Sequence, residues 1–214
     1  MAIQQEVPGI DTYMVDARPE QATSSAVLSG WEAAEKLTPA TGDFPVEFKH
    51  SEEPQVVKFI DPSGPFASYR QHFLTDKVGR KSYVCLGADC PLCLKLRHRP
   101  EDKRAFTVAN LSVTPVQKQM IIASPRLFKT LHMINSTPQG PITKNYWAIS
   151  RSGVKQSTIY HVVAIKERDL AEDYGIDLTT AATAVAAIEP FSNSTIKQTS
   201  YSDLLAIAEE LLNR

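Results

Sequence analysis

The chain has 214 residues, of which 43% are hydrophobic and 22% charged, and its formal net charge is −1. This composition is typical of a soluble protein with one principal domain and flanking tails. It excludes a membrane span, because no apolar run approaches the roughly 18 to 20 residues needed, and the start lacks the features of a signal peptide. We therefore expect a cytoplasmic protein.

The near-zero net charge conceals three regions of different sign. Residues 1–43 carry two basic and seven acidic side chains (net −5), residues 44–166 carry eighteen and eight (net +10), and residues 167–214 carry three and nine (net −6). No Asp or Glu occurs from Lys103 through Lys166. A basic region of this length is typical of a surface that binds a polyanion, and nucleic acid is the partner it favours.

Residues 1–43 are expected to form an acidic, partly disordered N-terminal region. They mix polar and small residues, and Arg18 and Lys36 are their only cations. One helix-like patch, SGWEAAEKL, surrounds Trp31 and has Ser29 as a plausible N-terminal cap.

Residues 44–166 are expected to form a β-rich domain of short strands. Segments rich in Val, Ile, Thr and aromatic residues alternate with turn residues, as in DPSGP and TPQGP. One helix interrupts them, because PRLFKTLHMI places Leu127, Leu131 and Ile134 on one face and Pro125 is tolerated in a first turn. Five to eight strands in about 120 residues favour a small barrel over a two-sheet sandwich. We predict a mainly β fold with peripheral helices, built on an OB-like five-stranded barrel.

Residues 167–214 are expected to form an acidic helical region. The segments LTTAATAVAAIEPF and YSDLLAIAEELLNR have helical periodicity, and Ser202 is the expected cap of the second. That second segment carries apolar residues at helical spacing: Leu204, Leu205, Ala208, Leu211 and Leu212. We expect an amphipathic helix that packs on the barrel or on another subunit.

The three cysteines form the most informative cluster of the sequence. Cys85, Cys90 and Cys93 follow a C-x4-C-x2-C pattern, in which the CxxC half lets two thiolates on one turn reach the same ion at about 2.3 Å. Gly87 and Pro91 suit such a turn. We predict one structural zinc ion in preference to a redox pair or a buried apolar cluster. The absence of HExxH and of a His-x-Glu partner argues against catalytic zinc.

Two histidines are candidates for the fourth ligand of this zinc. His72 precedes Cys85 by thirteen positions in a strand-like segment, and a hairpin through TDKVGRKSY would return it to the cysteines. His98 follows Cys93 by five positions but lies between arginines, in a loop suited to phosphate. We favour His72, and spacing alone leaves both open.

Single-stranded DNA binding needs flat side chains that stack on bases and cations that follow the backbone. The basic region interleaves the two kinds, although aromatic residues in strands more often pack in a core. The candidate DNA-binding residues are Lys58, Phe59, Tyr69, Arg70, Arg80, Lys81, Tyr83, Arg97, Arg99, Lys103, Arg104, Phe106, Lys144, Tyr146 and Trp147.

The run VVKFIDPSGPFASYRQHFL followed by GRKSYVCLGADCPLC resembles the zinc-containing, OB-fold single-stranded-DNA-binding (helix-destabilising) proteins of bacteriophages, T-even type. The ligand order of that family is His, twelve residues, Cys, a spacer and CxxC, and His72, Cys85, Cys90 and Cys93 match it. The match selects His72 over His98. The resemblance covers roughly residues 55–110 and implies a barrel with a zinc subdomain inserted at about residues 66–104. It also implies a basic, aromatic-lined cleft and a role in DNA replication, recombination and repair in the host cytoplasm.

The sequence departs from that family in two ways, and the second argues against strong cooperativity along DNA. The spacer between Cys85 and Cys90 is shorter than in the T-even protein, and the basic N-terminal arm that serves cooperative self-association is absent. The acidic C-terminal region is a shared feature, which implies recruitment of replication and recombination proteins.

These features lead us to expect a non-enzymatic, sequence-tolerant single-stranded-DNA-binding protein with one structural zinc. The alternative from another class is a zinc-stabilised module, like a transcription factor, that binds duplex DNA or a protein. An enzyme is not favoured, because no acid–base pair or nucleophile constellation occurs in the sequence.

Overall fold

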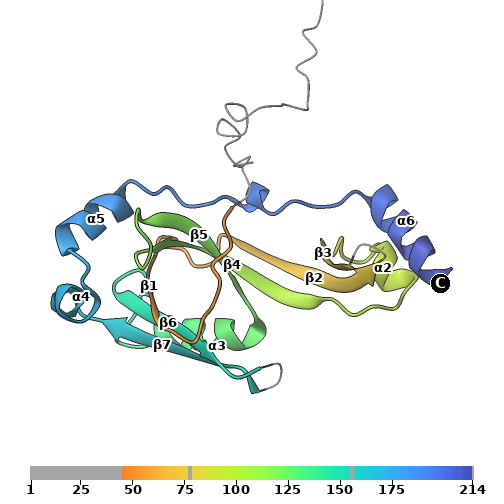
Figure 1. Cartoon of the computed structure of the whole chain (residues 1–214). Coiled ribbons are helices and arrows are strands. Elements are labelled where there is room, and N and C mark those ends of the chain that lie inside the picture. The colour runs from red at the N-terminus through yellow and green to blue at the C-terminus, as the bar shows by residue number, and fades with distance from the viewer. Residues whose placement is uncertain (1–44, 77–78, 155–156, 214) are drawn as a thin grey trace, which may run out of the picture. The chain divides into compact units, whose positions relative to one another are not determined.

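The computed structural model describes residues 45–76, 79–154 and 157–213, which belong to the compact unit Asp43–Arg214 (Figure 1). The expected N-terminal region, with its helix-like patch around Trp31, lies outside the described residues. Among those described, no helix is both long and apolar enough to cross a membrane.

The described chain is mainly antiparallel β-structure followed by helices, which confirms the β-rich class and the helical C-terminal region. The strands are β1 (Gln55–Phe59), β2 (Ala67–Asp76), β3 (Gly79–Val84), β4 (Glu101–Asn110), β5 (Gln117–Ala123), β6 (Tyr146–Ser152) and β7 (Ile159–Ile165). The helices are α2 (Pro91–Leu94), α3 (Pro125–Asn135), α4 (Glu167–Tyr174), α5 (Leu178–Ala186), the 3-10 helix η2 (Asn193–Thr195) and α6 (Tyr201–Leu212).

The long strand β4 organises the sheet. Its first half pairs with β2, with Ala105 opposite Ala67, and its second half pairs with β1, with Val108 opposite Phe59. On its other edge β4 pairs with β5. The remaining order is β3-β2-β4-β1-β6-β7, and all these pairings are antiparallel.

The number of strands and their closure differ from the predicted five-stranded barrel. The sheet has seven strands, and no pairing among the described residues joins β7 back to β5 or β3, so the sheet is not a closed barrel. The count rises because the segment around the cysteines contributes the hairpin β2–β3, which extends β4 beyond its pairing with β1.

The main core lies between the sheet and α3. Leu127, Leu131 and Ile134 are buried on one face of α3, as predicted, and pack with residues such as Phe59 and Trp147. The Ser124 side chain caps the helix by accepting a hydrogen bond from the Leu127 N–H, and the rigid ring of Pro125 occupies the first turn. A second cluster packs α4 and α5 on the same strands through residues such as Leu170 and Ala181.

The segment between α5 and α6 passes along the strands (Figure 1), and Phe191 contacts residues of β4 and β5. The Phe191 N–H donates a hydrogen bond of 2.9 Å to Thr107 Oγ1, and Lys118 Nζ lies 4.0 Å from the centroid of the Phe191 ring. The Phe66 ring lies 5.7 Å from the same ring. The chain then enters α6.

The cap of α6 differs from the prediction. Ser200 Oγ, and not Ser202, accepts the capping hydrogen bond, from the Asp203 N–H. Leu204 and Ala208 are buried, as the helical spacing predicts, whereas Leu212 is 55% exposed.

Candidate metal centre and basic groove

A β-hairpin places His72 close to the cysteines, as the sequence predicts. In the pairing of β2 with β3, His72 stands opposite Tyr83, two residues before Cys85. The Cys85 N–H donates a hydrogen bond of 2.8 Å to the Arg70 carbonyl, which continues the ladder past the end of β3. The metal unit is defined here as residues 67–100, which contain β2, β3 and α2.

The other two cysteines lie on a tight turn that opens into α2. Cys90 occupies the cap position, with Pro91 in the first turn, and its carbonyl accepts hydrogen bonds of 3.0 Å from the N–H groups of Cys93 and Leu94. Gly87 precedes the turn with a φ of +90°, a conformation that residues with a Cβ rarely adopt.

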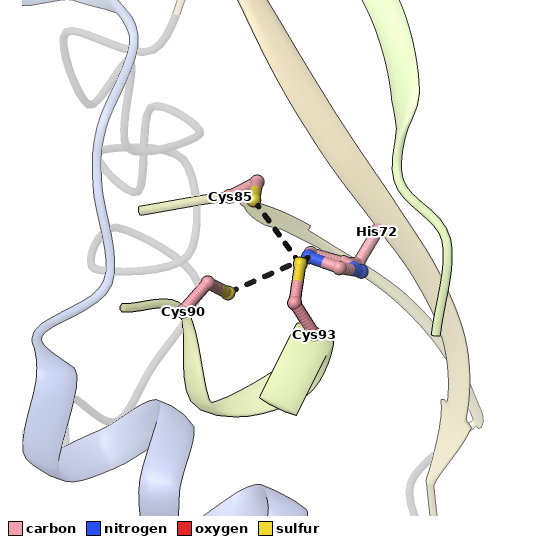
Figure 2. Close-up of side chains that lie close together, drawn as sticks. All are labelled: His72, Cys85, Cys90 and Cys93. Atoms are coloured by element: carbon pink, nitrogen blue, oxygen red, sulfur yellow. Dashed lines mark hydrogen bonds between the residues drawn. The ribbon is translucent and has the colours of Figure 1, made fainter. Parts of the chain in front are cut away.

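The four predicted ligands converge on one point (Figure 2). Their donor atoms all lie within 4.8 Å of one another; His72 Nε2 is 3.5 Å from the sulfurs of both Cys90 and Cys93, and the Cys85 and Cys93 sulfurs are 3.6 Å apart. In a tetrahedral site with bonds of about 2.0 to 2.3 Å, neighbouring ligand atoms are separated by about 3.3 to 3.8 Å. The cluster can therefore hold one metal ion.

The surroundings of the cysteine thiols shift their pKa values in different directions. Burial, together with the Cys85 side chain, raises the pKa of Cys93 to about 12. For Cys90, burial also opposes ionisation, but backbone N–H groups, that of Leu86 foremost, outweigh it and lower the pKa. Three crowded thiolates need a cation to be stable together, and the ligand form of cysteine is the thiolate.

The alternative ligand, His98, stands behind His72 and outside the cluster. Its Nδ1 lies 3.0 Å from His72 Nδ1, while His72 Nε2 faces the sulfurs. The His98 N–H donates to the Leu92 carbonyl at 3.2 Å, which fixes the loop on which the ring is carried.

Helix α6 covers one side of the metal unit. Leu204 and Ala208 pack in one buried cluster with Leu74, Cys90 and Leu92. An ion pair of 2.7 Å between Lys95 Nζ and Glu209 Oε1 joins α6 to the end of α2. The C-terminal region is therefore part of the wall of the candidate metal centre.

The structure separates the candidate DNA-binding residues into three groups by exposure. The exposed ones are Arg70, Arg80, Lys81, Arg97, Arg99 and Lys144. The half-buried ones are Lys58, Tyr69, Tyr83, Lys103 and Arg104. The buried ones are Phe59, Phe106, Tyr146 and Trp147.

The four buried aromatics are corrections to the predicted DNA contacts. Each is at most 5% exposed, because β1, β4 and β6 have α3 on one face and the α4–α5 cluster on the other, so both alternating sets of side chains are covered. Trp147 even satisfies its indole N–H internally, by donating to the Ile142 carbonyl at 2.6 Å. These rings are packed in the core.

Phe73 is an exposed aromatic that the prediction omitted. It is 47% exposed, and Lys103 Nζ lies 4.7 Å from its ring centroid. The alternation of side chains along a strand could have predicted this exposure. His72 and Leu74 face the metal centre and α6, so Phe73 between them points to the opposite face.

Two adjoining hollows form a groove lined by four arginines. One hollow, of about 600 Å³, is lined by Arg70, Arg99, Pro100, Glu101, Asp102 and Pro125. The other, of about 470 Å³, is lined by Glu101, Ser124, Pro125, Arg126, Arg151, Thr158 and Tyr160. They share Glu101 and Pro125, and together they are called the arginine groove. The sequence interpretation did not select Arg126, Arg151 or Tyr160.

The carboxylates of the groove are engaged by cations at its edge. Asp102 lies 3.4 Å from Arg70 and 3.8 Å from Arg104, and Glu101 lies 2.9 Å from Lys103. Both carboxylates are more than half exposed, so each pair contributes little to stability. With four arginines and two carboxylates in its lining, the groove carries an excess of positive charge.

Comparisons of the chain with protein-family models, with curated proteins and with solved structures gave no match. The function of the chain is therefore argued from its own residues.

Proposed function

We propose that this chain is a non-enzymatic, sequence-tolerant single-stranded-DNA-binding protein that acts in DNA replication, recombination and repair. The observation that carries the proposal is the arginine groove, which runs from the metal unit at Arg70 and Arg99 to the β6–β7 hairpin at Arg151 and Thr158. The resemblance of the cysteine region to the phage helix-destabilising proteins points to the same function.

We propose zinc as the metal and a structural role for it. One imidazole and three thiolates fill all four positions of a tetrahedral zinc site, whereas catalytic zinc sites keep one position for water or substrate. His72 and Cys90 are fully buried, which suits an ion that holds the chain in place. The ion would fix the hairpin that carries Arg70 and Phe73.

The strand order supports an OB-like core made of β1, β4, β5, β6 and β7. In it, β1 pairs with both β4 and β6, β4 pairs with β5, and α3 connects β5 to β6. An OB-fold is a partly open five-stranded barrel that binds oligonucleotides with the loops between its first two and its last two strands. In this reading the metal unit is inserted between the first two strands, and the β6–β7 hairpin joins the last two.

The groove offers the chemistry that an unpaired strand needs. Arginine side chains bind phosphates, and aromatic rings stack on bases without regard to sequence. Tyr160 lines the groove, whereas Phe73, an exposed ring with a lysine over it, lies on the metal unit outside the two hollows.

The duplex-binding alternative has weaker support. Duplex readers of the major groove insert an α-helix or a two-stranded ribbon. Neither helix of this region suits that role, because α2 has only four residues and α6 packs against the metal unit, so a duplex reader here would have to use the β2–β3 hairpin. Competition between single-stranded and duplex oligonucleotides of the same sequence distinguishes the readings, since preference for duplex would favour the alternative.

Replication and recombination proteins are proposed partners of the acidic C-terminal region. Glu172 and Asp173 on α4 and Asp203 on α6 are exposed, so a basic surface of another protein can reach them. Pull-down with wild-type chain and with these three residues changed to Asn or Gln would test this.

Titration of a fluorescently labelled oligonucleotide at several salt concentrations tests the proposed function. The zinc-loaded full chain should bind short strands of unrelated sequence with similar affinity. Affinity should fall steeply with salt, because each phosphate contact releases counterions. Binding that is absent, or that does not change with salt, would refute the proposal.

A further inference from the structure

Two arginines from distant parts of the chain meet in the β6–β7 half of the arginine groove. Arg151 of β6 stands opposite Tyr160 of β7, so the two side chains lie side by side on one face of the sheet. Arg126 extends from the first turn of α3. Both guanidinium groups converge on Thr158: Arg126 Nη1 donates to its carbonyl at 3.3 Å, and Arg151 Nη2 donates to its Oγ1 at 3.4 Å.

The charge of Arg151 has no carboxylate partner within 4.0 Å among the described residues. Its Nε is covered and makes no hydrogen bond with any part of the chain that the structure describes, and the same is true of Nδ1 of the neighbouring His50. Burial, with the Arg151 charge second, lowers the pKa of His50 to about 4, so its ring is neutral and adds no charge to the hollow. The carboxylate in this hollow, Glu101, is held by Lys103 at 2.9 Å.

We propose that this hollow is a phosphate subsite, in which Arg126 and Arg151 bind one phosphodiester of a single strand while Tyr160 stacks beside an adjacent base. A guanidinium presents its N–H donors in a planar fork that matches two phosphate oxygens. The N-terminal end of α3 opens into the same hollow and adds positive potential. The subsite rests on the proposed function and extends it, since it assigns a role to residues that the sequence did not suggest.

The position of the subsite determines the path of a bound DNA strand across the protein. The two hollows meet at Glu101 and Pro125, so a strand that contacts Arg70 and Arg99 reaches Arg151 by crossing the N-terminal end of α3. The metal unit and the β6–β7 hairpin would then hold successive parts of one oligonucleotide.

Charge-removing variants of the zinc-loaded full chain test the subsite. Because both arginines contact the same phosphodiester, the Arg126→Gln/Arg151→Gln double variant should reduce the slope of log affinity against log salt by about 1, and each single variant should reduce it by no more than that. Each should weaken binding about 10-fold at about 0.1 M salt, as expected for the loss of a hydrogen bond to a charged group. Arg151→Lys should keep the slope, because it keeps the charge.

Arg168→Gln is the matched control, because Arg168 is exposed on α4, pairs with its neighbour Asp169 and lines neither hollow. It should leave affinity and slope unchanged. Thermal unfolding of each variant verifies that it folds, and exposed Arg126 keeps the test valid if Arg151→Gln does not fold.

An oligonucleotide with one uncharged methylphosphonate linkage gives a second readout. As the neutral linkage is moved along the strand, one position should weaken the wild type but not the double variant. If the wild type binds no single strand, the proposed function fails. If the wild type binds and the double variant keeps its affinity and salt slope, the subsite alone is wrong.

Discussion

His72 Nδ1 lies 3.0 Å from His98 Nδ1, and this contact distinguishes the roles of the two histidines. Two ring nitrogens at this distance share one hydrogen. Because His72 Nε2 faces the sulfurs and must be unprotonated to bind a metal, the hydrogen belongs on His72 Nδ1, and His98 accepts it. With a metal bound at the cluster, His98 would therefore orient the His72 ring and would not itself be a ligand.

Histidine substitutions test this assignment. His72→Ala should abolish stoichiometric zinc binding, because it removes a ligand. His98→Ala should keep one zinc per chain but weaken its affinity by about 10- to 100-fold, as for other residues that hydrogen-bond to a metal ligand. Competition with a chromogenic chelator measures both. Full zinc affinity in His72→Ala would show that His72 is not the fourth ligand.

Zinc removal should release helix α6. Leu204 and Ala208 pack on Cys90 and Leu92, whose positions depend on the metal turn. Chelation, or Cys90→Ser, should therefore raise amide hydrogen exchange across residues 201–212 while α3 stays protected. Equal protection of α6 with and without zinc would contradict this coupling. Lys95→Ala serves as a control that loses only the exposed ion pair with Glu209.

Substitution of an exposed aromatic residue should weaken DNA binding, whereas substitution of a buried one should lower stability. Phe73→Ala should weaken DNA binding by on the order of 1–3 kcal/mol, the value of one stacked base, with little change in stability because the ring is 47% exposed. Trp147→Ala should lower the free energy of unfolding by roughly 3–5 kcal/mol, because it empties a fully buried site. Oligonucleotide titration and urea unfolding separate the two. Weakened DNA binding in a fully folded Trp147→Ala protein would contradict its placement in the core.

Because of His50, the free energy of unfolding should fall as the pH is lowered from about 6.5 to about 4. Burial, with Arg151 second, lowers the folded-state pKa of His50 from 6.5 to about 4. Below pH 6.5 the unfolded chain binds a proton that the folded chain refuses, so acid favours unfolding by up to about 3 kcal/mol. Unfolding of His50→Phe against pH provides the check. Both proteins lose zinc in acid, so the difference between them isolates His50, and identical pH profiles would refute the prediction.

Patterns in short stretches of sequence predicted the helix faces and the metal ligands more accurately than they predicted which aromatic side chains are buried. The cysteine spacing and the apolar face of α3 depend on residues near one another in sequence, and both are formed as predicted. The burial of Phe59 and Trp147 depends on which strands lie inside the sheet, and that is decided by pairings between distant segments. Because side chains alternate between the two faces of a strand, the prediction that His72 faces the metal implies that Phe73 points to the opposite face.

The groove arginines lay beyond what local patterns can predict. Arg126 lies in the first turn of α3, and Arg151 lies near the end of β6, 25 positions later. The register of β6 with β7 and the packing of α3 on the sheet together bring both to Thr158. The sequence identified the basic region as a whole, since its charge is a sum over residues. It could not identify which cations share a hollow.

The packing of α6 on the metal turn also bears on how fast the ion can leave. Cys90 is fully buried beneath Leu204 and Ala208, so a chelator reaches its sulfur only after α6 has moved away. The helix would thus act as a kinetic barrier: a chain cut before Ser200 should hold an ion through the same four side chains but exchange it faster. The residence time of a metal bound there would be set partly by residues more than one hundred positions away from the four ligands.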